Sequence, residues 1–592
     1  MILSAVTIFL SAFLLFQVQP LIAKIILPWF GGSAAVWSAA MLFFQLLLLA
    51  GYGYAHCLIR YLKPKAQVNV HAGLLAISFA LLPILPSPSW KPTVAGDPTF
   101  RILLLLAATI GLPYFLLSST SPLLQAWYVR RSGSAVPYRL FALSNFGSML
   151  ALLSFPFWVE PNLTSSHQAY TWSAAYGLFA ILCGFVAFGA RMPGIKTAPP
   201  VDAAVAETEN SPPAVERSDR PALSEMVLWV ALAACASTLL VSVTNHLSQN
   251  VAPIPLLWVL PLALYLLSFI LAFESDRIYI RWVFIPFLVP SLGAMAYFIY
   301  ADQGNYHIRI IIPIYAAGLF FCCMLCHGEL ARRKPAPHYL TQFYLMISLG
   351  GALGGIFVAL IAPRVFRAYL ELPIGLIACA LLTAVALWNV TIPKLGWSPL
   401  RGLALAGAGV LAGYLIRMEY STEKQYHLIV RNFYGVLRVS DEGDNGAPQD
   451  AVRELLHGTI SHGSQLLDEK LKYEPTTYYG RTSGVGRAIA ALETRGPVRV
   501  GSIGLGAGVL TTYGRPGDYY RVYEINPLVP KIATTEFSFF PHSPADKAIL
   551  LGDARLTLER QEAQNFDLLS VDAFSSDAIP IHLLTREAVE LY

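Results

Sequence analysis

Charged residues are scarce in this chain of 592 residues. Asp, Glu, Lys and Arg make up 13% of it, whereas ~25% is usual for a soluble domain. Hydrophobic residues make up 55%, and the mean hydropathy is +0.55. This composition excludes a disordered protein and argues against a purely soluble enzyme, because so much apolar surface needs a bilayer.

The charge that is present is divided unevenly along the chain. Residues 1–419 carry a net charge of +10, whereas residues 420–592 carry −5. The first part has the composition of a membrane region, and the second that of an acidic, water-soluble region. Neither contains a basic stripe outside short loops beside apolar segments, so we expect the lipid bilayer as a partner and no nucleic acid.

Cysteine is absent after Cys379, which excludes a disulfide framework in the soluble region. The seven cysteines, all in apolar segments, are Cys57, Cys183, Cys235, Cys322, Cys323, Cys326 and Cys379. Cys323, Cys326 and His327 match the C-x-x-C-H pattern of covalent haem attachment. They lie just before the basic run 332–334, on the side of the membrane opposite to haem attachment in bacteria. We therefore interpret these cysteines as packing residues and expect no metal.

Long apolar runs fill the first part of the chain. Windows of about 20 apolar residues, the length that crosses a bilayer, predict about thirteen spans. They lie near 2–27, 34–59, 68–86, 99–118, 139–159, 170–190, 223–243, 254–273, 280–300, 308–326, 339–361, 371–391 and 399–416. The count carries an error of one or two, because neighbouring windows are easily merged or split.

Ionisable residues are rare inside these windows, which argues against an ion-coupled transporter. The best candidates for a buried polar site are Asn145, Asn245, His246, Gln249 and Asn250. Such residues hold helices together more often than they bind a substrate. A small-xxx-small pattern at Gly350, Gly351, Gly354 and Gly355 predicts close helix packing.

Lys and Arg gather in alternate loops, which predicts a cytoplasmic N-terminus in a bacterial inner membrane. The basic loops hold residues such as Arg60, Lys63, Arg130, Arg191, Arg277, Arg333 and Arg401, and the opposite loops hold only Lys24, Lys91, Arg101, Arg309, Arg364 and Arg367. Thirteen spans would then place the acidic region outside the cytoplasm, and twelve or fourteen would place it inside.

The segment 191–222 is rich in Pro, Ala and charge and has no apolar period, so it predicts a flexible linker. It divides the spans into one group at 1–190 and another at 223–418. Transporters are often built from two such halves. A weak internal echo, SSTSPLLQAW at 118–127 and SQNVAPIPLLWVLP at 248–261, fits a repeat or a chance recurrence in a Leu-rich chain.

From residue 419 the hydrophobic period changes. Residues 426–439 alternate like strands, and 484–494 has the period of an amphipathic helix. Four strands follow at 498–503, 519–525, 548–551 and 566–571. Their ends carry a glycine loop, Glu524, Asp553 and Asp572 in turn, a pattern typical of a doubly wound sheet with a ligand beyond the strand ends. Solvated loop ends of an ordinary Rossmann domain are the alternative.

These strand ends lie in motifs that resemble the spermidine synthase-like family, the polyamine aminopropyltransferases. The motifs are YEIN at 523–526, LGDAR at 551–555 and DLLSVDAFSSDAIPIHLLTREAVELY at 567–592. The apolar half resembles bacterial membrane proteins in which this domain is fused to a transporter-like helix bundle. The resemblance implies a multi-span α-helical membrane bundle, a small β subdomain at 419–483 and a Rossmann-like, S-adenosylmethionine methyltransferase-type α/β domain at 484–592.

The resemblance also implies roles for single residues. Gly504, Gly506 and Gly508 would lie under the methionine part of S-adenosylmethionine or its decarboxylated form. Glu524 would hold the ribose hydroxyls, Asp553 the adenine amino group, and Gln465 would contact the same co-substrate. Asp572 would accept the proton of the attacking amine, with Asp577 as a second carboxylate and Tyr478 and Tyr479 as the substrate gate.

Departures from the family pattern fall mainly on the amine side. The gate reads Tyr478-Tyr479-Gly480 where Tyr-His-Glu is usual, Ala507 replaces an acidic residue, and Asn526 stands where Asp is common. Putrescine is therefore a doubtful acceptor. Only four strands are predicted of the seven in a complete methyltransferase-type sheet, so we expect a domain truncated at its C-terminal edge.

The main hypothesis is a membrane-bound transferase that moves an aminopropyl or methyl group to a small amine. An alternative is a transporter or exporter whose soluble domain senses or modifies its cargo, and a third is a binding module without catalysis. Because adenosyl compounds are cytoplasmic metabolites, the chemistry favours a cytoplasmic C-terminal domain. The sequence leaves open whether the protein forms a homo-oligomer.

Overall fold

A computed structural model describes most of the chain. The described residues are 2–92, 96–132, 137–189, 221–250, 254–275, 277–301, 308–335, 339–388, 399–443, 451–458, 460–574 and 579–592. Nearly all of the expected linker at 191–222 lies outside them, as does Asp577.

The first helical group precedes residue 190. It consists of α1 (Ile2–Ile26), a 3-10 turn η1 (Leu27–Phe30), α2 (Ala34–Tyr61), α3 (Pro64–Ser78), α4 (Thr99–Leu106), a π turn (Ala107–Gly111), α5 (Leu112–Ser132), α6 (Pro137–Ser154), α7 (Glu160–Asn162) and α8 (Ser165–Gly189). Ser33 caps α2 by accepting a hydrogen bond from the amide of Ala35 at 3.2 Å. This cap fixes the turn between α1 and α2, which becomes important for the site.

The second helical group follows residue 222. It consists of α9 (Leu223–Asn250), α10 (Pro255–Glu274), α11 (Arg281–Ala301), α12 (Ile308–Arg332), α13 (Leu340–Ile356), α14 (Ala362–Val365), α15 (Glu371–Ala386) and α16 (Pro399–Glu423). A Cβ on Gly350 would lie 2.4 Å from the carbonyl oxygen of Val230, and one on Gly354 would lie 2.7 Å from that of Ala234. These two glycines therefore let α13 pack closely on α9, as predicted.

Ten helices in the described part of the chain are long and apolar enough to cross a membrane. Each of the thirteen predicted windows contains a helix, and the three windows outside this set hold α3, α6 and α15. The protein is therefore a multi-pass membrane protein. The predicted count of thirteen is higher than the ten that length and hydropathy support.

Two four-stranded sheets follow α16. The first is antiparallel, in the order β1 (Leu428–Asn432), β2 (Gly435–Glu442), β3 (Val452–His457) and β4 (Ile460–Leu466). The second is parallel, in the order β7 (Asp546–Leu551), β6 (Tyr519–Glu524), β5 (Arg499–Ile503) and β8 (Leu568–Val571). Helices α17 (Gly484–Glu493), α18 (Leu528–Thr535), α19 (Phe539–His542), α20 (Ala554–Leu558) and α21 (Arg586–Leu591) accompany it. The predicted strands and the helix at 484–494 are thus confirmed.

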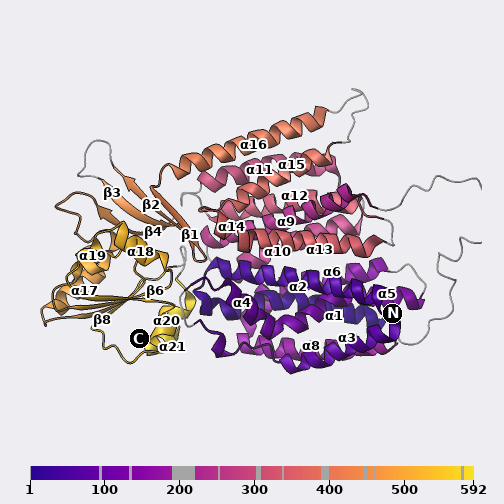
Figure 1. Cartoon of the computed structure of the whole chain (residues 1–592), viewed down its shortest axis with the longest axis horizontal. Coiled ribbons are helices and arrows are strands. Elements are labelled where there is room, and N and C mark those ends of the chain that lie inside the picture. The colour runs from indigo at the N-terminus through magenta and orange to yellow at the C-terminus, as the bar shows by residue number, and fades with distance from the viewer. Residues whose placement is uncertain are drawn as a thin grey trace, which may run out of the picture.

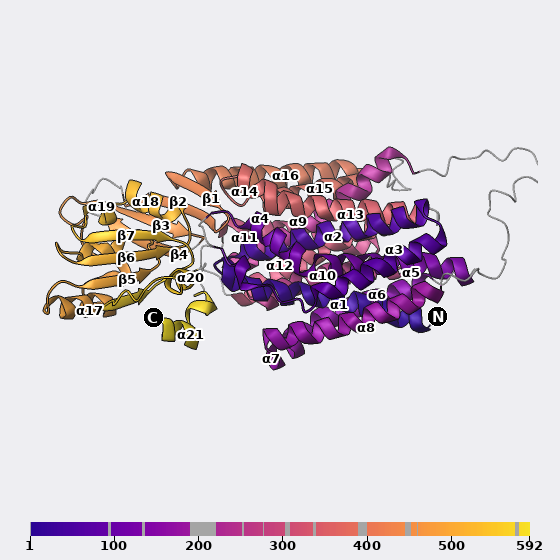
Figure 2. The same ribbon diagram turned by 60° about the horizontal axis from the view of Figure 1, so that its bottom comes forward.

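The two sheets lie together at one end of the helix bundle (Figure 1, Figure 2). A buried ion pair joins Arg431 of β1 to Glu371 of α15 at 2.8 Å, and Arg431 also donates to the carbonyl of Ala368. Lys91 forms a second, more exposed pair with Glu559 at 3.5 Å. The bundle and the sheets therefore form a joined structure.

The start of α1 and the two sheets lie at opposite ends of the helix bundle (Figure 1).

Candidate functional site

The parallel sheet brings five predicted residues to one edge. The register pairs Ile503 with both Tyr523 and Val571, and Glu524 with Leu551, so the four strands end at the same level. A cavity of about 90 Å³ lies there. Its lining includes Gly504, Gly506, Glu524, Asp553 and Asp572. The strand-end pattern thus predicts which side chains gather, because parallel strands present their carboxyl ends to one edge.

The glycine loop is shaped by contacts with its own chain. Gly504 and Gly506 have φ of +99° and +54°, a region that side chains rarely adopt. A Cβ on Gly504 would lie 2.2 Å from the carbonyl oxygen of Asp572, and one on Gly506 would lie 2.3 Å from that of His462. Glycine is thus required at both positions by the packing of the chain's own backbone.

Glu524 is hydrogen-bonded to the backbone of the glycine loop and of its own strand end. Its carboxylate oxygens accept hydrogen bonds from the amides of Leu505 at 3.1 Å and Asn526 at 2.8 Å. Burial raises the pKa of Glu524, and the backbone donors partly oppose that rise. The amide of Ile525 also interacts with this carboxylate. A carboxylate has about four acceptor positions, so these amide bonds still leave acceptor capacity for a ligand hydroxyl.

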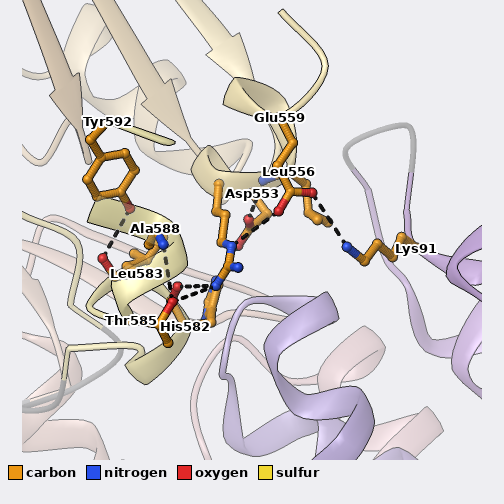
Figure 3. A network of polar contacts seen from close by, with 10 residues as sticks. Lys91, Asp553, Leu556, Glu559, His582, Leu583, Thr585, Ala588 and Tyr592 are labelled. Carbon is orange, nitrogen blue, oxygen red and sulfur yellow. Dashed lines mark hydrogen bonds and ion pairs between the residues drawn. The ribbon is translucent and has the colours of Figure 1, made fainter. Parts of the chain in front are cut away.

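Asp553 is held between a helix and a histidine. One oxygen caps α20 by accepting from the amide of Leu556 at 3.0 Å, and the other lies 2.8 Å from Nε2 of His582 (Figure 3). His582 also lines the cavity. It was not singled out from the sequence, although it lies inside the quoted motif at 567–592. No residue pattern indicates this partner, because 29 positions separate it from Asp553.

Asp572 accepts hydrogen bonds from two tyrosines. Tyr478 donates to its Oδ2 at 3.2 Å, and Tyr479 donates to the same oxygen. Burial first, and then the nearby carboxylate, raises the pKa of both tyrosines above the ordinary range, so both remain hydrogen-bond donors at neutral pH. Among the described residues, no hydrogen-bond donor reaches Oδ1 of Asp572, and the residue lines the cavity.

Tyr478 and Tyr479, which reach Asp572, lie outside the cavity lining, and so do Gln465 and Gly508. Gln465 is buried, and its amide group is satisfied by the carbonyl of Lys472 at 2.8 Å and the amide of Ser538 at 3.1 Å. Gly508 packs against Phe540, where a Cβ would lie at 3.3 Å. Both positions support the fold around the site without reaching the cavity.

The helix bundle supplies part of the cavity wall. Gly31 and Ser33, in the turn between η1 and α2, line the cavity beside Tyr434 of the β1–β2 turn. A Cβ on Gly31 would lie 2.3 Å from Cδ1 of Ile525, directly after Glu524. The contact shows how closely the bundle end fits against the strand ends. Sequence reasoning missed these residues, because they are about 470 positions away from the glycine loop.

A larger cavity of about 940 Å³ adjoins the first, between the bundle end and the antiparallel sheet. Ser33, Tyr434 and His457 line both cavities. Four of the five predicted buried polar residues line the larger one: Asn245, His246, Gln249 and Asn250. The fifth, Asn145, is buried in α6 elsewhere.

The larger cavity contains polar groups without partners. The hydroxyls of Ser242, Ser248 and Ser440 and Nε of Arg438 are buried and have no hydrogen-bond partner within the described chain. All four residues line this cavity. Unsatisfied buried donors are costly, so this surface is suited to a polar solute or ordered water.

Comparisons with known proteins agree with the motifs. No protein-family model matches the chain. The polyamine aminopropyltransferase of Vibrio vulnificus (strain CMCP6) is 35% identical over 96 residues, which is 15% of this chain and 31% of that enzyme. The chain therefore spans about a third of the curated relative that it matches. The crystal structure of a bacterial homologue of the human lysosomal transporter Spinster, inward-facing and unoccupied, overlays with a TM-score of 0.37 and 13% identity. That overlay covers 71% of this chain and 93% of the other. After its apolar helices, the chain thus carries a region similar to polyamine aminopropyltransferases.

Proposed function

We propose that the parallel sheet belongs to a Rossmann-like domain that binds S-adenosylmethionine or its decarboxylated form. When the four strands are numbered by their order in the chain, they lie across the sheet in the order 3-2-1-4. The first strands of a doubly wound nucleotide-binding sheet have the same order. The similarity to an aminopropyltransferase supports the same reading. The proposed reaction transfers an aminopropyl or methyl group to a small amine.

The arrangement of Asp572 carries this proposal. Two tyrosines hold one oxygen of its carboxylate, and the second oxygen is left free within the described residues. The co-substrate supplies a carbon activated by a positively charged sulfur. Asp572 would accept the proton as the amine nitrogen forms its bond to that carbon, while the carbon–sulfur bond breaks and its electron pair remains on sulfur.

The fit of an adenosyl group requires an opening of the site. Ligand sites usually measure ~300–1,000 Å³, and the strand-end cavity measures about 90 Å³. Glu524 retains acceptor positions for hydroxyls, whereas Asp553 is engaged by His582. We infer that His582 and the turn at Gly31–Ser33 move aside when a ligand binds.

Calorimetric titration of the full chain in detergent tests this function. The titrants are S-adenosylmethionine and its decarboxylated form, and micromolar binding of either is expected. Glu524→Gln should weaken binding about 10–100-fold, because a charged acceptor contributes ~1.5–3 kcal/mol. Glu562→Gln, an exposed acid on the loop after α20, is the matched control. No binding by the unaltered chain would overturn the proposal.

The larger cavity favours a second candidate function, the binding and passage of a polar solute. Its wall combines the amides and imidazole at the end of α9 with the unpartnered hydroxyls of Ser242 and Ser248. Uptake of labelled spermidine into vesicles should fall when His246 becomes Ala. His71→Ala, a buried histidine of α3 away from this cavity, is the control. Equal uptake in empty vesicles would remove this candidate.

The side of the membrane on which the sheets lie decides between the two functions. Basic residues concentrate at the end of the bundle opposite to the sheets: Arg60, Lys63, Arg130, Arg277, Arg281, Arg332, Arg333, Lys334 and Arg401. We infer that this end faces the cytoplasm. The sheets would then lie on the opposite side, in contrast to the cytoplasmic position expected from the location of adenosyl compounds. An adenosyl substrate would then have to reach the sheets through the bundle.

Cysteine labelling of intact cells measures this orientation. In a Cys57→Ser background, Lys470→Cys places a thiol on the exposed loop after β4, and Lys63→Cys places one at the opposite end of the bundle. A membrane-impermeant maleimide should label the first and spare the second. The reverse pattern would put the sheets in the cytoplasm and favour the transferase acting on cellular S-adenosylmethionine.

A further inference from the structure

Four of the seven cysteines converge in the core of the second helical group. Cys235 comes from α9, Cys326 from α12 and Cys379 from α15, and their three sulfur atoms all lie within 4.8 Å of one another. Cys322, one turn before Cys326, interacts with Cys379. The strand-end site lies in another part of the molecule and uses none of these residues.

The C-x-x-C-H motif is divided between two faces of α12. Cys326 faces α9 and α15, whereas His327 faces α10 and bonds through Nδ1 with the hydroxyl of Ser268 at 2.9 Å. Cys323 also lies beside Ser268. A haem attachment motif needs both thiols on one accessible surface, and both are fully buried here.

Close helix packing creates the thiol cluster. A Cβ on Gly375 would lie 2.9 Å from a methyl carbon of Leu239, so glycine allows α15 to approach α9. The thiol of Cys235 donates to the carbonyl of Gly375 at 3.8 Å, a weak interaction. All three cysteines belong to the buried hydrophobic core of the bundle.

The size of the cluster suits a metal ion. Three sulfur atoms separated by at most 4.8 Å have a common centre no more than roughly 2.8 Å from each, and metal–thiolate bonds measure ~2.3 Å. Contraction by about half an ångström would therefore complete a site. All seven cysteines are free thiols, so no disulfide competes for these sulfurs.

We propose that Cys235, Cys326 and Cys379 bind one monovalent copper ion within the membrane region. Thiolates are soft ligands that select Cu(I), and the cluster contains no carboxylate or imidazole that would favour harder ions. Zinc almost always takes four ligands in structural sites, whereas three sulfur atoms share this centre. A single positive charge also needs fewer ionised thiols in an apolar core, which limits the buried charge.

Copper loading of the full-length protein tests the site. Protein purified in detergent under reducing conditions is incubated with Cu(I) and a competing Cu(I) chelator, and retained metal is measured by mass spectrometry. The unaltered chain should retain one copper ion per molecule. Cys235→Ser and Cys379→Ser should each weaken retention at least 10-fold, and X-ray absorption should show sulfur at about 2.3 Å.

Cys183→Ser is the matched control, because Cys183 is also fully buried but lies in α8 of the other helical group. This variant should retain copper like the unaltered chain. The thermal midpoints of the metal-free variants identify any substitution that merely disturbs packing, and Cys326→Ala provides a second test where a serine variant does not fold. Absence of copper from the unaltered chain, equal retention by Cys235→Ser, or retention of zinc instead of copper would each overturn the proposal.

Discussion

Nε2 of His582 lies 2.8 Å from Oδ2 of Asp553, at the position where the proposed adenine amino group would bind. His582 lies two residues after Pro580, and its side chain is largely buried in the cavity wall. A ligand that uses Asp553 must therefore replace this contact. The pair links a strand-end acid to the last part of the chain.

Removal of His582 should make adenosyl binding tighter. In His582→Ala the carboxylate of Asp553 is no longer engaged, so we expect a 5–30-fold lower Kd, which corresponds to ~1–2 kcal/mol. Calorimetric titration with S-adenosylmethionine measures this change. The control is His542→Ala, whose imidazole stacks on Tyr473 outside the cavity. Weaker binding by His582→Ala would mean that the histidine contacts the ligand instead of blocking it.

Asp572→Asn should abolish transfer while leaving ligand affinity nearly unchanged. The amide keeps the shape of the side chain but cannot accept the amine proton. Tyr479→Phe should lower kcat about 10-fold, because it removes a donor that orients the carboxylate. Product formation from radiolabelled decarboxylated S-adenosylmethionine and an amine gives the rate. Turnover by Asp572→Asn equal to that of the unaltered chain would exclude Asp572 as the base.

The small β sheet should lose stability in weak acid. Burial lowers the pKa of His457 and of His462 to about 4, and their rings lie 5.5 Å apart. The unfolded chain binds these protons near pH 6.5 and the folded chain only near pH 4. Stability is therefore complete above pH 6.5 and falls between pH 6.5 and 4, by on the order of 3 kcal/mol for each histidine.

Hydrogen exchange of residues 460–466, corrected for the intrinsic rate at each pH, measures this loss. His457→Gln combined with His462→Gln should flatten the profile between pH 6.5 and 4. His167→Gln, an exposed histidine at the start of α8, should leave it unchanged. A double variant with the original pH dependence would assign the acid sensitivity to other groups.

The ion pair between Glu371 and Arg431 should hold the sheets on the bundle. Both side chains are nearly inaccessible, and Arg431 also stacks over Tyr369 at 4.4 Å. Glu371→Gln leaves a buried guanidinium without its counter-charge, which costs ~3–5 kcal/mol. Limited proteolysis after α16 should become at least 10-fold faster in this variant. Glu559→Gln breaks the more exposed pairs of Glu559 with Lys91 and Arg555 and should change the rate less than 3-fold.

Periodicity and strand-end patterns were sufficient to predict the local structure. The four parallel strands and the gathering of Glu524, Asp553 and Asp572 follow from short-range features, since strand period and parallel geometry are local rules. The span count was less secure, because α3 and α15 are too short to be distinguished from buried soluble helices by hydropathy.

Contacts between residues far apart in the chain could not be predicted from the sequence. Ser33 and Gly31 form a cavity wall with residues more than 400 positions away, and His582 reaches Asp553 through a turn that no spacing rule describes. The cysteines of α9, α12 and α15 were assigned to packing because they lie in apolar segments, and no spacing rule places Cys235 and Cys379 beside Cys326. Such sites depend on tertiary packing, which no local period encodes.

The close fit of Gly31 against Ile525 has a practical consequence for biochemistry on this protein. A water-soluble fragment that begins after α16 would lack one wall of the strand-end cavity and would expose Ile525 to solvent. Its affinity for any nucleoside would describe an opened cleft, and its solubility would suffer. Assays on the excised domain and on the membrane-embedded chain should therefore differ, and the size of that difference measures how strongly the bundle controls the site.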